Sequence, residues 1–107
     1  MLELGKECRK LEVLVHVSTA YVNCIQHGFV EEKIHSVSDD ITSLVERIMS
    51  MPDKEINERL DKILGNYPNT YTFTKSLAER RFQQLRGHLP AVIYRPSIIT
   101  GSYTEPF

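Results

Sequence analysis

Asn69–Glu79 reads NTYTFTKSLAE and places a tyrosine, Tyr71, four residues before a lysine, Lys75. On a helix, residues four apart lie on one face, so these two side chains are expected to lie together. A phenol is normally a poor acid near neutral pH because its pKa is about 10, but an adjacent ammonium stabilises the phenolate and lowers that pKa. The pair is therefore a candidate acid–base device for carbonyl chemistry.

Two short apolar runs flank this stretch and predict parallel strands. Residues 11–18 read LEVLVHVS, a valine-rich run typical of a buried strand, and the hydroxyls of Ser18 and Thr19 lie at its end. Residues 91–95 read AVIYR and lead into the loop at 96–101. Ligands of open α/β sheets bind beyond the carboxyl ends of the strands, so both loops are expected to face one crevice.

A helical insertion is predicted over 38–64, between the first strand and the tyrosine helix. Ser38 can cap its first helix, and the acidic residues that follow, Asp39 and Asp40, are favoured in a first turn. Apolar residues recur at helical spacing up to Met51, and again in a second helix that runs from about residue 53 to a glycine at 65. Such stripes most often face a core.

The helix that carries Tyr71 is predicted over 69–87. Its apolar residues occupy two seams, one with Phe82 and one with Phe73 and Leu77, so the helix is apolar over a wide arc. A helix of this kind is expected to be sandwiched between other elements. The polar pair near its start would then point into the crevice at the sheet edge.

This order of elements resembles the extended short-chain dehydrogenase/reductase superfamily. Within it, three stretches resemble the central reductase domain of alcohol-forming fatty acyl-CoA reductases: HVSTAY at 16–21, YPNTYTFTKSLAE at 67–79 and YRPSIITGS at 94–102, with EPF at 105–107 after them. The resemblance covers nearly the whole chain and is weakest at 26–51. It implies an α/β fold in which residues 1–107 form the central, incomplete part of a doubly wound parallel-sheet (Rossmann-like) NAD(P)-binding domain.

The resemblance also implies roles for individual residues. Thr19, or Ser18 in its place, would hydrogen-bond the substrate carbonyl oxygen, and Tyr71 would donate the proton as hydride reaches the carbon. Lys75 would assist the phenol and hydrogen-bond the nicotinamide ribose. For Arg95, a salt bridge at the strand end and a binding role both stay open. The implied cofactor-binding set is Tyr71, Lys75, Pro96, Ser97 and Ile98.

The reaction that the resemblance implies is reduction of a long-chain fatty acyl-CoA to a fatty alcohol, with NADPH and an aldehyde held by the enzyme. In this family a glycine-rich turn receives the cofactor pyrophosphate, and none of the five glycines of this chain stands in that arrangement. We therefore expect the chain to be part of a longer enzyme and to be inactive alone.

Two alternatives remain. The Tyr–Lys pair is shared with other extended short-chain reductases, such as sugar-nucleotide epimerases and hydroxysteroid dehydrogenases. From a different class, the chain could be a truncated product without catalysis that acts only as an interaction fragment. The neighbouring coding sequence would discriminate best, because an upstream glycine-rich strand and turn would restore the enzyme.

Composition narrows the possible partners and compartments. The net charge of −1 offers no general attraction to nucleic acid, so we expect none to bind. No transmembrane run or signal peptide is visible in the sequence, and the presence of only two cysteines fits a reducing, intracellular compartment. The resemblance implies association with the peroxisomal or endoplasmic reticulum membrane. We expect any contact with that membrane to be made through parts of the enzyme that are absent here. A zinc set is rejected because the available residues have no compact ligand spacing: Cys8, His16, Cys24 and His27.

Overall fold

The computed structural model describes residues 1–35 and 40–104 and has an α/β fold. Its parallel two-stranded sheet pairs β1 with β2, Leu14 lying opposite Ala91 and Val17 opposite Tyr94. Because the strands are parallel, their carboxyl ends meet at one edge of the sheet. The element order is α1 (Leu2–Glu7), β1 (Leu14–Val17), the 3₁₀ helix η1 (Ala20–Asn23), α2 (Ile41–Ser50), α3 (Asp53–Glu58), α4 (Leu60–Leu64), α5 (Thr70–Leu85) and β2 (Ala91–Tyr94).

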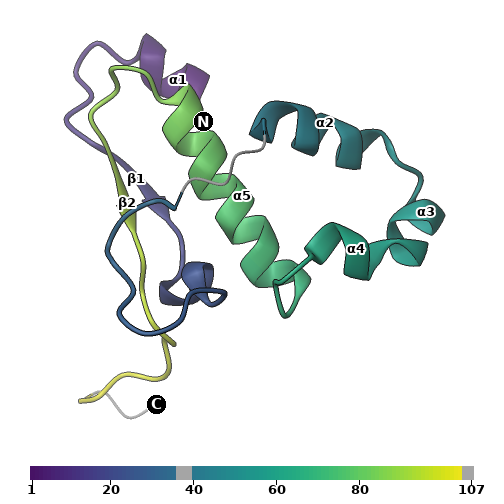
Figure 1. The fold of residues 1–107 in the computed structure, drawn as a ribbon. Coiled ribbons are helices and arrows are strands. Elements are labelled where there is room, and N and C mark those ends of the chain that lie inside the picture. Colours follow the sequence, from purple (N-terminus) through teal and green to yellow (C-terminus); the bar gives the residue numbers. More distant parts are fainter. Residues whose placement is uncertain (36–39, 105–107) are drawn as a thin grey trace.

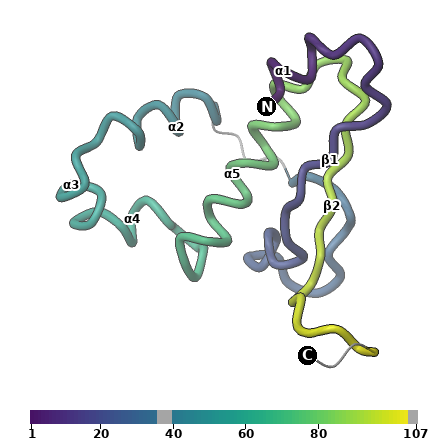
Figure 2. Tube along the Cα trace, turned by 180° about the vertical axis from the view of Figure 1, so that it is seen from behind, coloured from purple at the N-terminus to yellow at the C-terminus, as the bar shows by residue number. Residues whose placement is uncertain are grey.

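Helix α5 lies between the sheet and an arc formed by α2, α3 and α4, as both views of the chain show (Figures 1 and 2). On the arc side, Phe73 and Leu77 of α5 are buried in one apolar cluster with Ile41 of α2. On the sheet side, Phe82 stacks on His16 of β1 with 5.0 Å between ring centroids. The helix is thus sandwiched, which explains why apolar residues occupy two of its seams.

Both strands and α5 are shorter than the ranges predicted from the sequence. The first strand was predicted over 11–18, whereas β1 covers only Leu14–Val17, the residues paired with β2. Likewise β2 ends at Tyr94, one residue before the predicted end. Helix α5 begins at Thr70 because the Asn69 side chain accepts a hydrogen bond from the Thr72 amide at 2.9 Å.

The helical insertion differs from its prediction at two points. Ser38 and Asp39 lie outside the described residues, and Asp40, predicted in the first turn of α2, is instead its N-cap and accepts from the Thr42 amide at 3.0 Å. The second predicted helix is divided at Arg59, whose φ of −112° and ψ of 12° lie outside the helical range. This break lets α4 turn back and pack Ile63 and Leu64 on the cluster beneath α2.

Helices α1 and η1 were not predicted from the sequence. Both are short, and a segment of four to six residues shows no helical period that a sequence pattern could reveal.

Within the described part of the chain, no helix is long and apolar enough to cross a bilayer.

Burial alternates along both strands, and one face of the sheet is uncovered. Leu14 and His16 are half-buried on the side of α5, whereas Val15 and Val17 are 49% and 52% exposed. Val92 and Tyr94 of β2 are exposed in the same way. Parallel sheets are normally covered on both faces, so this apolar face lacks a partner among the described residues.

We expect residues 1–107 expressed alone to melt in a broad, weakly cooperative transition, because apolar sheet residues such as Val15 and Val92 are left in water. Scanning calorimetry with a hydrophobic dye as a second probe measures this. A single sharp transition, with equal calorimetric and van't Hoff enthalpies and no dye binding, would contradict the expectation.

Candidate active site

The two loops that leave the sheet at its carboxyl edge are held side by side. Beyond the last strand pair, the Ser18 amide donates to the Tyr94 carbonyl at 2.7 Å, and the Ala20 amide donates to the Pro96 carbonyl at 2.9 Å. These two bonds continue the parallel register into the loops. The hydroxyl residues after β1 and the loop after β2 therefore share one edge.

Tyr71 and Lys75 reach the same edge from the first turns of α5. The Lys75 Nζ lies 5.9 Å from the centroid of the Tyr71 ring and donates to the Val17 carbonyl at 3.1 Å. The ammonium is thus anchored to the last residue of β1, directly before Ser18. Tyr71 as a residue is 54% exposed, so it is accessible from solvent.

The two candidate hydroxyls have different surroundings, although Ser18 and Thr19 are both buried. Thr19 Oγ1 accepts a hydrogen bond from the Tyr21 amide at 3.2 Å, as N-cap of η1. This contact uses the oxygen as acceptor and leaves the hydroxyl hydrogen available to another acceptor. Ser18 Oγ is buried and has no hydrogen-bond partner among the described residues.

The loop residues after β2 form an open surface beside these groups. Pro96 is half-buried, whereas Ser97 and Ile98 are exposed, Ile98 by 72%. The structure thus brings all the predicted site residues to one edge of the sheet, Tyr71 and Lys75 from α5, Ser18 and Thr19 from β1, and Pro96–Ile98 from the end of β2.

Glu79 was not among the residues predicted for the site, and the structure pairs it with Arg95. The Arg95 Nε and Nη2 donate to the two carboxylate oxygens of Glu79 at 2.8 and 2.6 Å, and Nη2 also donates to the Lys33 carbonyl at 3.0 Å. Glu79 is only 2% exposed. The hydrogen bond from Arg95 to Glu79 raises the pKa of the guanidinium further, so Arg95 keeps its positive charge. Of the two possibilities for Arg95, the structure therefore shows the salt bridge.

A signal for Glu79 was present in the sequence. It stands four residues after Lys75, so it occupies the same side of α5, where a carboxylate among apolar residues is unusual. Its partner is 16 residues away, at the end of a strand, and the spacing within α5 gives no information about that distance.

His16 lies beneath the same part of α5, stacked on Phe82. Burial lowers the pKa of His16, the positive charge of Lys75 lowers it further, and Glu79 acts in the opposite direction. The imidazole is therefore neutral near pH 7 and adds no second positive charge beside Lys75.

Chemically, this edge presents a phenol, an ammonium and a hydroxyl donor beside an open loop, a set suited to proton transfer at a carbonyl. Across residues 1–35 and 40–104, no three His, Cys, Asp or Glu residues come together as a metal site. Cys8 and Cys24 are free and exposed.

Comparison with known proteins gives a consistent match. The model of the male sterility protein family, an NAD-binding family, matches residues 1–107. Fatty acyl-CoA reductase 1 of Xenopus laevis is 43% identical over 107 residues, and that of Gallus gallus is 40% identical over 107 residues; each alignment covers 100% of this chain and 21% of the relative. Fatty acyl-CoA reductase 2 of Bos taurus is 35% identical over 108 residues, again 100% of this chain and 21% of the relative. The chain thus spans about a fifth of the length of these relatives. No solved structure matches.

Proposed function

Because the chain belongs to the male sterility protein family of NAD-binding domains, we propose that it is the central part of an enzyme that reduces long-chain fatty acyl-CoA to fatty alcohol with NADPH. The observation that carries this proposal is the Tyr71–Lys75 pair, anchored to the end of β1 beside Thr19. The relatives are named fatty acyl-CoA reductases, which supports the substrate class. In the whole protein, the two-stranded sheet would belong to a doubly wound sheet.

In this proposal the reacting carbonyl oxygen lies between Tyr71 and Thr19. Thr19 donates a hydrogen bond to that oxygen, because a carbonyl oxygen can only accept and the Tyr21 amide, which donates to Thr19 Oγ1, leaves the hydroxyl hydrogen free. Tyr71 donates the proton that turns the reduced carbonyl into an alcohol. Lys75 stabilises the resulting phenolate electrostatically while the Val17 carbonyl holds its ammonium in place.

The residues at this edge fit a nicotinamide cofactor, which supplies the hydride when it is bound. The ammonium of Lys75 offers donors to ribose hydroxyls beside the exposed ring of Tyr71, because it still has hydrogens free beyond its bond to the Val17 carbonyl. Pro96, Ser97 and Ile98 offer a partly apolar, open surface on which a flat ring can lie.

Product analysis tests the reaction. We expect the full-length enzyme that contains this segment to consume about two NADPH per acyl-CoA and to release alcohol and free CoA. The first hydride addition leads to loss of CoA as its thiol and gives the aldehyde, the second reduces the aldehyde, and Tyr71 can protonate the oxygen after each. Mass spectrometry of the products, with NADPH followed by absorbance, measures this. Free aldehyde as the only product, or turnover of UDP-sugars or steroids instead, would assign the protein to another branch of reductases.

Lys75→Arg should not rescue function. A guanidinium keeps the positive charge, but it is planar and larger than an ammonium. It cannot donate to the Val17 carbonyl and to a ribose hydroxyl at the same time while its charge stays next to the Tyr71 ring. We expect NADPH affinity to fall and the pH optimum of turnover to shift. Calorimetry and a pH–rate profile measure the two effects, and near-normal values in both would show that Lys75 is only a surface residue of α5.

A further inference from the structure

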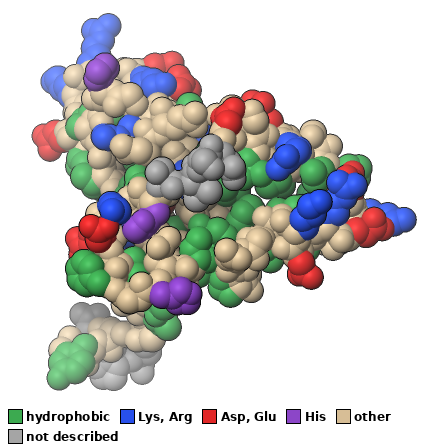
Figure 3. All heavy atoms as spheres, viewed as in Figure 1, with side chains coloured by type: hydrophobic (Ala, Val, Ile, Leu, Met, Phe, Trp, Pro, Cys, Tyr) green, Lys and Arg blue, Asp and Glu red, His purple; other side chains and the backbone are tan. Residues whose placement is uncertain are grey.

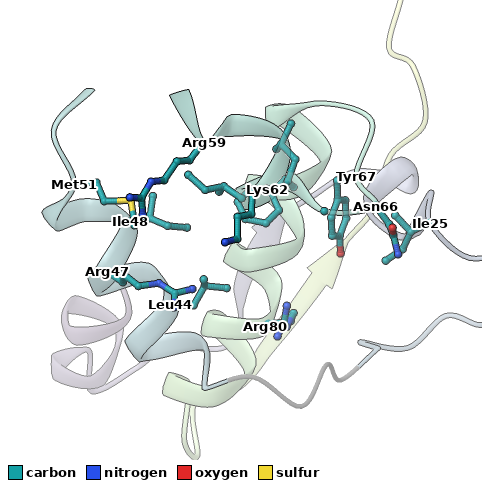
Figure 4. A pocket seen from close by; sticks show the side chains of 14 residues that line it. Ile25, Leu44, Arg47, Ile48, Met51, Arg59, Lys62, Asn66, Tyr67 and Arg80 are labelled. Atoms are coloured by element: carbon teal, nitrogen blue, oxygen red, sulfur yellow. The ribbon is translucent and has the colours of Figure 1, made fainter. Parts of the chain in front are cut away.

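A cavity of about 500 Å³ lies between α2, α4 and α5, on the side of α5 that faces the helical arc (Figure 4). Leu44 and Ile48 of α2, Ile63 of α4 and Phe73 of α5 give it an apolar wall. In Figure 3, apolar side chains are visible between α5 and the helical arc, and both basic and acidic side chains lie on the surface of the arc.

The charges around this cavity all have one sign. Four cationic residues line it, and no aspartate or glutamate does: Arg47, Arg59, Lys62 and Arg80. Arg59 pairs with Glu55 at 3.2 Å, but the buried Nη2 of Arg80 has no hydrogen-bond partner among the described residues. Figure 4 shows Arg47 and Lys62 extending from α2 and α4 into the space between these helices. In a chain with a net charge of −1, three cations of this lining, Arg47, Lys62 and Arg80, are thus in no ion pair with the described residues and give the cavity a positive field.

The cavity also borders the segment that leads to the active site. Asn66 and Tyr67 line it just before α5 begins, and Tyr71 stands in the first turn of that helix. The Tyr67 hydroxyl lies 2.6 Å from Ser76 Oγ, within hydrogen-bond distance. The Tyr67 ring packs edge-on against the ring of Phe73, with 5.6 Å between the ring centroids. This packing fixes the cavity wall relative to the start of α5.

We propose that this cavity binds the phosphate-bearing nucleotide end of the CoA thioester, an inference that rests on the proposed reductase function. Several phosphates on one ligand match several cations, and guanidinium groups bind phosphate oxygens in a bidentate manner. The adenine ring is flat and packs on aliphatic and aromatic side chains, which the walls at Leu44, Ile48 and Phe73 provide. A free carboxylate would use one or two of the cations and leave the others uncompensated.

The test compares two substrates in the full-length enzyme. Palmitoyl-CoA carries the phosphates, whereas S-palmitoyl-N-acetylcysteamine keeps the thioester and lacks them. In the Arg47→Gln/Lys62→Gln variant, we expect the preference for palmitoyl-CoA, as a ratio of kcat/KM values, to fall about tenfold or more. The matched control, Lys10→Gln/Lys54→Gln, removes the same charge from exposed residues that do not line this cavity, and should leave the ratio unchanged.

Binding of CoA alone, followed by calorimetry, separates this inference from the proposed function. If the affinity for CoA falls about tenfold in the cavity variant and not in the control, the cavity is the nucleotide site, even where palmitoyl-CoA is not reduced. If palmitoyl-CoA is reduced but both variants keep the wild-type ratio and CoA affinity, the inference is wrong and the proposed function stands. An equal fall in CoA affinity in the cavity variant and in the control also overturns the inference, because it would show that CoA responds to the overall charge of the protein and not to this cavity.

Discussion

Tyr71→Phe should lower the turnover of the full-length reductase by about 100- to 10,000-fold, the range that a positioned general acid contributes. The substitution keeps the ring beside Lys75 and removes only the hydroxyl that donates the proton. Because the ring and the ammonium stay in place, we expect NADPH affinity to remain close to that of the wild type. Steady-state kinetics and calorimetry on the same preparation measure both quantities.

The matched control is Tyr103→Phe, which removes a hydroxyl from a fully exposed tyrosine outside the site and should leave turnover unchanged. If Tyr71→Phe retains more than a tenth of wild-type turnover, Tyr71 is not the acid. If it loses NADPH binding together with turnover, the phenol hydroxyl acts mainly in holding the cofactor.

Arg95→Leu should destabilise the protein by about 3 to 5 kcal/mol, because removing one partner of a buried ion pair leaves the other charge uncompensated. The carboxylate of Glu79 is almost fully enclosed and receives both of its side-chain hydrogen bonds from Arg95. The same change releases the Lys33 carbonyl from the guanidinium. Denaturant unfolding of the full-length protein, followed by fluorescence and circular dichroism, measures the free energy of unfolding.

Two controls make this prediction specific. Glu79→Gln added to Arg95→Leu removes the buried charge and should recover part of the lost stability. Lys54→Ala breaks the exposed pair with Glu58, 3.9 Å long, and should change the free energy of unfolding by less than about 1 kcal/mol. A cost below about 1 kcal/mol for Arg95→Leu, or no recovery in the double variant, would show that the pair contributes little.

Local patterns were enough to predict the α/β class and two strands of a parallel sheet, whereas the direct pairing of these two strands was seen only in the structure. The spacing of Tyr71 and Lys75 predicted that they share a face of α5, because the helical period is a local property of the chain. The apolar seams of that helix likewise predicted that it would be covered on more than one side. The roles of these residues in catalysis stay predictions until the kinetic tests are made.

Those local patterns could not predict contacts between residues that are far apart in the sequence. Lys75 is held by the Val17 carbonyl, 58 residues away, and Glu79 is held by Arg95, 16 residues away. Three further features also depend on tertiary contacts that no local pattern reveals. They are the break at Arg59, the different surroundings of Ser18 and Thr19, and the position of Arg47, Lys62 and Arg80 around one cavity. The sequence by itself determined which local elements form and which groups each can present, through helical period, strand alternation and capping. Only the tertiary structure decided which of these groups meet, because that depends on how the sheet and the helical arc close around α5.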